Sequence, residues 1–235
     1  MNIIDIVILV VLGISALYGI YRGFMHTILS LACCLVSVIL AFSFSPKLAQ
    51  WIRNNPGISS TLATYTDAGA RVGDSDLANT SVQELPDYML QQILDNVTLP
   101  QPIAEILQNN LTNRVLENTN ENTVNDYVSK TIVTVVIDIL SFIACFIVAY
   151  LVLSLLINLI HHVFKLPLLK QLDWLAGGIF GLLRGAMTLY VIFLLIPIIS
   201  TVIPLDSFNV LLSESSLAPI FQSDGFFAKA IAGQL

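Results

Sequence analysis

Four stretches of the chain are nearly uninterrupted runs of apolar residues. They cover residues 3–21, 24–44, 131–160 and 172–203, and a helix needs about 20 such residues to cross a bilayer. The runs are apolar on every side, which is typical of helices that face lipid. The pattern therefore predicts an all-α polytopic membrane protein with about four transmembrane helices.

A polar region separates the second run from the third. Residues 46–130 contain ten acidic and five basic side chains, which accounts for most of the net charge of −6. Pro102 can begin a helix, and apolar residues follow it at helical spacing up to Val115; residues 85–93 suggest another short piece. We expect a helical acidic extracytoplasmic insertion that is flexible from residue 53 to residue 83.

These boundaries divide the chain into four parts. Residues 1–45 form a first transmembrane hairpin, 46–130 an acidic loop, 131–203 a second transmembrane pair and 204–235 an amphipathic tail. The third run is longer than a bilayer requires, since 30 residues would reach about 45 Å and the hydrocarbon core measures about 30 Å. Its helix should therefore protrude at the Thr131 end, with Asp138 near that interface.

Composition excludes several classes of protein. Apolar residues make up 56% and charged residues 11% of the chain, against about 25% charged in soluble domains. With a mean hydropathy of +0.82, neither a free-standing soluble protein nor a disordered one is expected. The negative net charge also argues against nucleic-acid binding, which is typical of proteins with clustered basic residues.

The basic residues of the short loops predict the orientation. Arg22 lies between the first two runs, and Lys165 and Lys170 follow the third. Positive charges in short loops favour the cytoplasmic side. We therefore expect the N-terminus, the acidic loop and the tail to be extracytoplasmic.

One sequence motif occurs twice. Residues 19–25 read G-I-Y-R-G-F-M, and residues 181–187 read G-L-L-R-G-A-M. An aspartate precedes each copy, Asp5 in the first and Asp173 in the second. The repeat predicts that an aspartate opens a helix, that the arginine-glycine pair turns it, and that a full span follows. Because residues 173–183 reach only about 16 Å, the fourth span should be preceded by a short re-entrant or interfacial helix.

The repeat supplies the candidate functional or packing residues. They are Asp5, Gly19, Arg22, Gly23, Asp173, Gly177, Gly181, Arg184 and Gly185. The spacing of the last three glycines allows two membrane helices to approach closely. One interpretation gives the glycines and arginines only packing and interface anchoring. The other treats interrupted helices at matching positions as a transport-like site.

At these residues the chain resembles the colicin V production protein (CvpA-like) family. One block consists of Asp5, G-I-Y-R-G-F at residues 19–24, L-S-L at 29–31 and Ala41, and the other of L-D at 172–173, Leu175, Gly177, Gly181 and R-G at 184–185. The chain departs from the family pattern at His26 and Trp174, where the family often has basic residues. The resemblance implies a bacterial cell-membrane protein connected with toxin production or export and with envelope stress tolerance. It implies no established catalytic residues.

Other candidate sites are weaker. Ser75 lies in a sequence that faintly echoes a serine-protease motif, but the three histidines (His26, His161 and His162) are expected on the opposite face of the membrane. The expected position of these histidines near one membrane interface suggests a metal or proton-sensing cluster. The alternative is that they are ordinary polar residues at that interface. The cysteines Cys33, Cys34 and Cys145 lie inside spans and suit packing. No Walker or dinucleotide motif occurs, so we expect no cofactor, metal or catalytic site.

The sequence features predict an integral membrane protein without an enzymatic site, and the resemblance implies a role accessory to toxin production, export and envelope maintenance. The alternative is a small transporter or channel subunit with a site near the two arginine-glycine pairs. The expected partners are the lipid bilayer and either another membrane protein or a second copy of the chain, but no nucleic acid.

Overall fold

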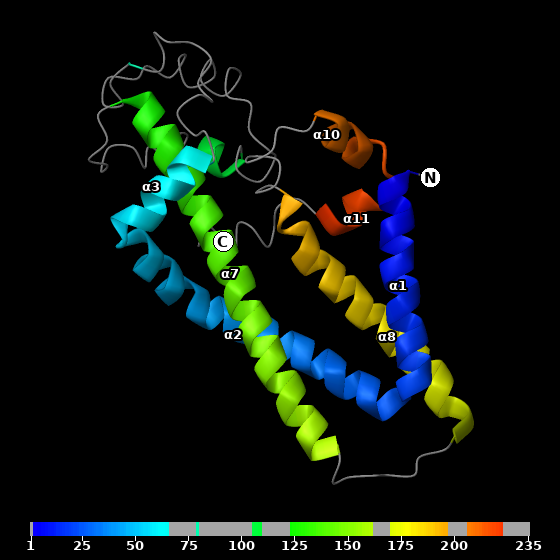
Figure 1. The fold of residues 1–235 in the computed structure, drawn as a ribbon. Helices are drawn as coiled ribbons and strands as arrows, with labels where there is room; N and C mark the ends of the chain where they lie inside the picture. The colour runs from blue at the N-terminus through cyan, green and yellow to red at the C-terminus, as the bar shows by residue number, and fades with distance from the viewer. Residues whose placement is uncertain are drawn as a thin grey trace. The chain divides into compact units, whose positions relative to one another are not determined.

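The computed structural model describes residues 2–65, 79, 105–109, 123–161, 170–196 and 206–222. These residues are almost entirely helical, which confirms the predicted all-α class (Figure 1). The helices are α1 (Ile3–Arg22), α2 (Phe24–Arg53), α3 (Pro56–Tyr65), α7 (Val124–His161), α8 (Lys170–Phe193), α10 (Asp206–Ser213) and α11 (Ala218–Gln222).

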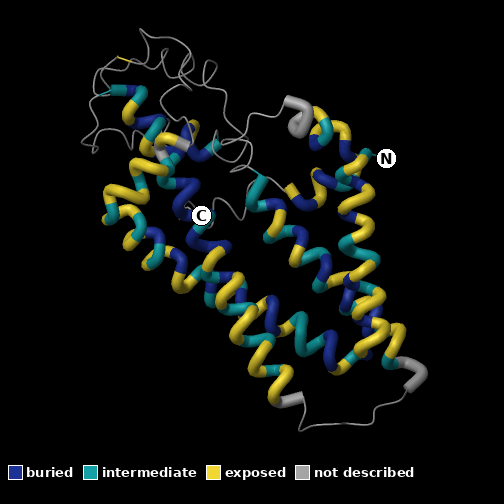
Figure 2. Tube along the Cα trace, viewed as in Figure 1, coloured by how far each residue is buried: buried dark blue, intermediate teal, exposed yellow. Residues whose placement is uncertain are grey.

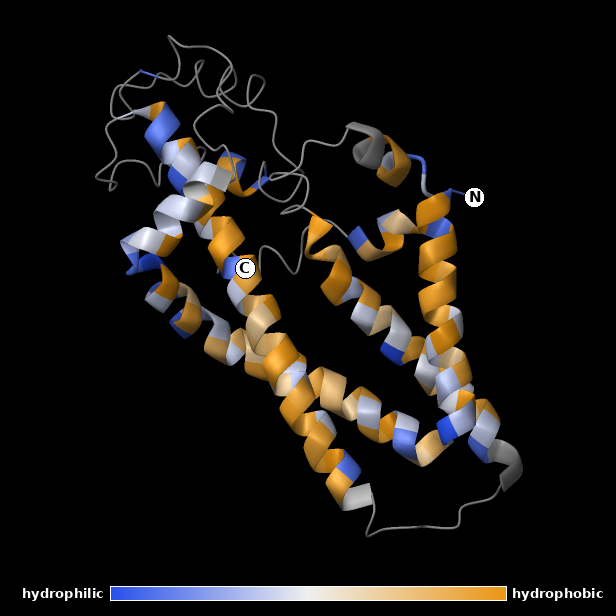
Figure 3. Cartoon of the chain, in the orientation of Figure 1, coloured by the Kyte–Doolittle hydropathy of each residue, from blue (hydrophilic) through white to orange (hydrophobic). Residues whose placement is uncertain are grey.

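Four of these helices are long and apolar enough to cross a membrane. The candidate spans are Ile3–Arg22, Phe24–Arg53, Val124–Leu159 and Asp173–Phe193. Apolar residues dominate α1 and the second half of α7 (Figure 3), and many of their large side chains, such as Leu17 and Leu155, are exposed. In water such surfaces would be unfavourable, so the bilayer is their natural environment.

The chain divides into two compact units. One comprises residues 1–46, 141–194 and 205–223, and the other comprises residues 47–140, 195–204 and 224–235. In the first unit α1 packs along α8, and the short helices α10 and α11 lie at one end of this pair (Figure 1). Figure 2 shows buried positions at intervals along α1 and α8 and exposed residues between them, as expected for helices with one packed face.

The second helix extends beyond the predicted apolar run. It continues through Pro46 to Arg53, although a proline inside a helix removes one backbone hydrogen bond. Within residues 53–83, which were expected to be flexible, α3 occupies Pro56–Tyr65. Pro56 has the fixed φ that suits a first helical residue, and the hydroxyls of Thr61 and Thr64 donate to carbonyls one turn earlier.

The third membrane helix is longer than the predicted apolar run. α7 runs from Val124, so it begins before residue 131. In the second unit, Arg53 forms an ion pair with Asp138 at 2.5 Å, a pairing that the apolar pattern of the sequence does not predict. Residues 105–109 form part of the helix expected after Pro102, and the piece expected at residues 85–93 lies outside the described residues.

The predicted break before the fourth span is wrong. α8 is one helix from Lys170 to Phe193 and passes through Arg184 and Gly185 without interruption. Glycine costs a helix only about 1 kcal/mol relative to alanine, so an R-G pair does not by itself turn a chain. Consequently there is no separate re-entrant or interfacial helix between Lys170 and Phe193, and Arg184 lies inside the candidate span Asp173–Phe193.

Candidate functional site

The helices α1 and α8 touch backbone to backbone through glycines of both repeat copies. A Cβ atom placed on Gly19 would lie 2.9 Å from the carbonyl carbon of Gly177 and 3.1 Å from the Cα of Gly181. A Cβ on Gly181 would lie 2.5 Å from the carbonyl oxygen of Ser15. Two of these separations are shorter than real Cβ atoms show and the third is tighter than most, so a side chain at either glycine would force the two backbones apart.

The turn between α1 and α2 lies against the second repeat copy. Gly23 ends α1 with φ of 82°, a conformation that favours glycine. The backbone N–H of Phe24 donates to Asp173 Oδ1 at 2.8 Å, and a Cβ on Gly23 would collide with the same carboxylate. Asp173 therefore caps the start of α2, a helix that is distant from it in sequence.

Removing this cap should destabilise the helix pair. We expect Asp173→Ala to lower the free energy of unfolding by about 1 kcal/mol, because the Phe24 N–H loses its acceptor. Asp173→Asn retains an oxygen acceptor and should cost less. Thermal unfolding in detergent measures both, and an equal fall for the two variants would show that the cap is not the cause.

The other aspartate of the repeat lies at the opposite end of α1. Asp5 is 1% exposed, and its Oδ1 accepts from the Ser215 hydroxyl at 2.6 Å and the Leu217 N–H at 3.0 Å. Its Oδ2 accepts from the Asn2 N–H. Asp5 thus fixes the segment between α10 and α11, and Phe221 of α11 packs with Tyr190 at the end of α8.

The two arginines of the repeat have different environments. Arg22 is exposed at the end of α1, with its guanidinium carbon 5.5 Å from the centre of the Tyr18 ring. Arg184 is partly buried near the middle of its span, 11 residues after Asp173 and 9 before Phe193. Its guanidinium carbon lies 4.8 Å from the same ring, so the tyrosine offers its face to both cations.

Serine hydroxyls hold the Arg184 guanidinium. Its Nε and Nη2 donate to Ser15 Oγ at 3.4 and 3.2 Å, and its Nη1 donates to Ser30 Oγ at 3.2 Å. Ser15 in turn donates to the Gly181 carbonyl at 2.7 Å. Arg184 therefore links α8 to both α1 and α2, and every partner in these bonds is neutral.

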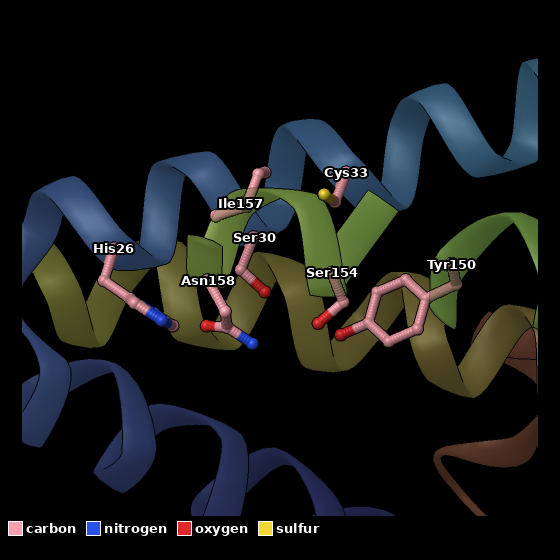
Figure 4. Close-up of a pocket in the computed structure, with 7 residues that line it drawn as sticks. All are labelled: His26, Ser30, Cys33, Tyr150, Ser154, Ile157 and Asn158. Carbon is pink, nitrogen blue, oxygen red and sulfur yellow. The ribbon is translucent and has the colours of Figure 1, made fainter. Parts of the chain in front are cut away.

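A small pocket lies next to Ser30, between α2 and the second half of α7. Its lining residues are His26, Ser30, Cys33, Tyr150, Ser154, Ile157 and Asn158 (Figure 4). The space measures about 20 Å³, which is enough for one group of the size of a water molecule. Figure 4 shows the hydroxyls of Ser30, Ser154 and Tyr150 pointing into the same space.

The pocket accounts for only part of the histidine cluster suggested by the sequence. His26 is buried beside the pocket, whereas the His161 side chain and all of His162 lie outside the described residues. Within the described part of the chain, no three His, Cys, Asp or Glu side chains are grouped as a metal site would require.

Comparison with known proteins identifies the family of this chain. The family model described as "Colicin V production protein" matches residues 4–72 and 103–225. The chain belongs to the colicin V production protein family. The match includes both repeat copies, and with the four apolar helices it makes this a membrane protein linked to colicin production.

The colicin V production family is not known as an enzyme family. No curated protein and no solved structure matches the chain. No related structure therefore contributes to the description of this site. The packing of α1 against α8, the Asp173 cap and the hydroxyl-bound Arg184 are features of this chain's own structure.

Sequence reasoning missed Tyr18, Ser15 and Ser30 as neighbours of Arg184. A usable signal exists for Ser15, which precedes Gly19 by one helical turn and therefore shares its face. Hydroxyls inside apolar spans also tend to face other helices rather than lipid. The partnership with Ser30 depends on how α2 folds back at Gly23, which no spacing along the chain reveals.

Proposed function

We propose that this protein is a non-enzymatic accessory component of colicin V production and export in the bacterial inner membrane, and that it contributes to envelope maintenance. Family membership supports the link to colicin production. The accessory role is inferred from how the repeat residues are used.

The observation that carries the proposal is that the repeat residues form the contacts between helices. Gly19, Gly177 and Gly181 bring two backbones into contact, and Asp173 caps a neighbouring helix. Such a rigid helix pair with exposed apolar faces suits a protein that organises partners in the plane of the membrane. The carboxylates Asp5 and Asp173 are both occupied by hydrogen bonds to backbone N–H groups, which leaves them poorly placed for acid-base chemistry.

A pull-down from the native membrane tests the accessory role. The tagged protein would be extracted in mild detergent, once with residues 66–104 and once without them. We expect a partner from the toxin-export or envelope machinery to copurify with the intact chain. Recovery of the protein without any such partner, from cells that are producing toxin, would contradict the proposal.

Transport is the second candidate, and Arg184 is the observation that favours it. A partly buried arginine near the middle of a span generally faces a path for solutes or a partner group. Flux of solutes in proteoliposomes separates the two functions. A copurifying partner without flux supports the accessory role, and flux by the purified chain supports transport.

We further propose that the N-terminus and the acidic loop are extracytoplasmic, because the short loops carry Arg22, Lys165 and Lys170. Single cysteines at Asn109 and Leu168, in a background without Cys33, Cys34 and Cys145, should label from opposite sides. The Asn109 site should react with an impermeant thiol reagent in spheroplasts that retain an intact inner membrane. The Leu168 site should react only after permeabilisation, and labelling of both sites before permeabilisation would refute this orientation.

A further inference from the structure

The positive charge of Arg184 is not neutralised by any acidic residue in the described part of the chain. A guanidinium has five N–H donors, and Arg184 makes three hydrogen bonds, all to the hydroxyls of Ser15 and Ser30. The ion pair found among the described residues joins Arg53 to Asp138 and does not involve Arg184. A charge near the middle of a membrane span is costly unless a counter-charge or water accompanies it.

The pocket beside Ser30 contains polar groups that make no hydrogen bond with the described residues. The Tyr150 hydroxyl, the Ser154 hydroxyl and the Asn158 amide have no hydrogen-bond partner among the described residues. Tyr150 and Ser154 are half-buried inside the candidate span Val124–Leu159, and Asn158 is exposed at its end. Polar groups inside a bilayer need a partner, because lipid offers none.

These groups share one chemical property, which is that each can donate a hydrogen bond. No acidic residue lines the pocket, whereas a cation site would require carboxylates or several carbonyl oxygens. Ser30 connects the pocket to Arg184, because it lines the pocket and its hydroxyl accepts a hydrogen bond from the Arg184 guanidinium. Donors together with a nearby uncompensated cation favour a negatively charged ligand.

The size of the pocket restricts that ligand. About 20 Å³ accommodates a single small group, so a halide fits better than a tetrahedral phosphate with four oxygens. We propose that the pocket between α2 and α7 binds a small inorganic anion of the size of chloride, held by the hydroxyls of Ser30 and Ser154 and by the charge of Arg184. This inference does not depend on the accessory role proposed above.

Chloride binding can be measured with the purified full-length protein in a zwitterionic detergent. Thermal unfolding would be followed in sodium chloride and in sodium gluconate at equal ionic strength, together with retention of radiolabelled chloride. A ligand that binds the folded state stabilises it by RT ln(1 + [L]/Kd). We expect a saturable rise in the unfolding temperature with chloride and none with gluconate.

Matched variants locate the site. Arg184→Gln should abolish chloride retention, and Arg22→Gln, which removes the same charge from an exposed position, should retain chloride as the wild type does. Ser154→Ala removes one of the two proposed hydroxyl donors without touching Arg184, so it should weaken retention even if Arg184→Gln does not fold.

Three results would overturn the proposal. The first is equal unfolding temperatures of the wild type in chloride and gluconate. The second is equal loss of chloride retention in the two arginine variants. The third is full displacement of chloride by inorganic phosphate or by phosphatidylglycerol micelles at lower concentration, which would show that the pocket prefers a larger oxyanion.

Discussion

Gly19→Ala should destabilise the protein, although alanine is the better helix former. The added methyl group would lie 2.9 Å from the carbonyl carbon of Gly177 and 3.1 Å from the Cα of Gly181. Backbone atoms cannot rotate away as a flexible side chain can, so α1 and α8 must separate. Overpacking of this kind costs about 1–3 kcal/mol, and each kcal/mol lowers the unfolding temperature by about 2–4 °C for a chain of this length.

Gly13→Ala is the matched control on the same helix. No atom lies within 4 Å of a Cβ at Gly13, so this substitution should gain the helix propensity of alanine, up to about 1 kcal/mol. The two variants should therefore shift the unfolding temperature in opposite directions. A rise of similar size in both would refute the close contact between α1 and α8.

Gly178 is a poorer control, despite its position between the two contact glycines. It is buried, and a Cβ there would lie 3.0 Å from Cγ1 of Ile20. A side chain can shift where a backbone cannot. We therefore expect Gly178→Ala to cost less than Gly19→Ala but more than Gly13→Ala, as the same melting curves would show.

Arg184→Lys should impair function while the protein still inserts at normal levels. A lysine ammonium is a single point on a flexible stem and does not reproduce the fork that reaches Ser15 and Ser30 together. Each hydrogen bond from a charged group contributes about 1.5–3 kcal/mol, and a loss of about 1.4 kcal/mol corresponds to a tenfold change in an equilibrium. We expect complementation of a toxin-production or envelope-stress defect to fall by about tenfold or more.

Arg22→Lys serves as the comparison. Arg22 is exposed at the end of α1, and a lysine there keeps an interfacial cation that can extend to the membrane surface. This variant should complement fully, with membrane abundance measured in parallel for both. Full complementation by Arg184→Lys as well would leave both arginines as anchors and remove the main support for a site.

The membrane architecture was predictable because the relevant signal is local. Runs of apolar residues at 3–21, 24–44, 131–160 and 172–203 identify four spans, since each helix must be apolar along its own length to face lipid. The repeat also identified the glycines that lie at the α1–α8 crossing, because small residues four apart share one helix face.

The conformation of each repeat copy was not predictable from the motif. Both copies contain R-G, yet the chain turns at Gly23 and continues as a helix through Gly185. At Gly23 the Asp173 carboxylate accepts from the first N–H of α2, and this distant group stabilises the break. At Gly185 a Cβ would lie 2.9 Å from the Ser15 side chain, so this glycine provides close packing.

The sequence by itself determined the class of protein, the spans and the family, because hydropathy and motif spacing are properties of neighbouring residues. Only the tertiary structure decided that Asp173 caps α2, that Asp5 holds the segment before α11, and that Ser30 shares Arg184 with Ser15. These contacts join residues between 149 and 212 positions apart. Such pairings depend on how the helices cross, and no periodicity along a single helix encodes that crossing.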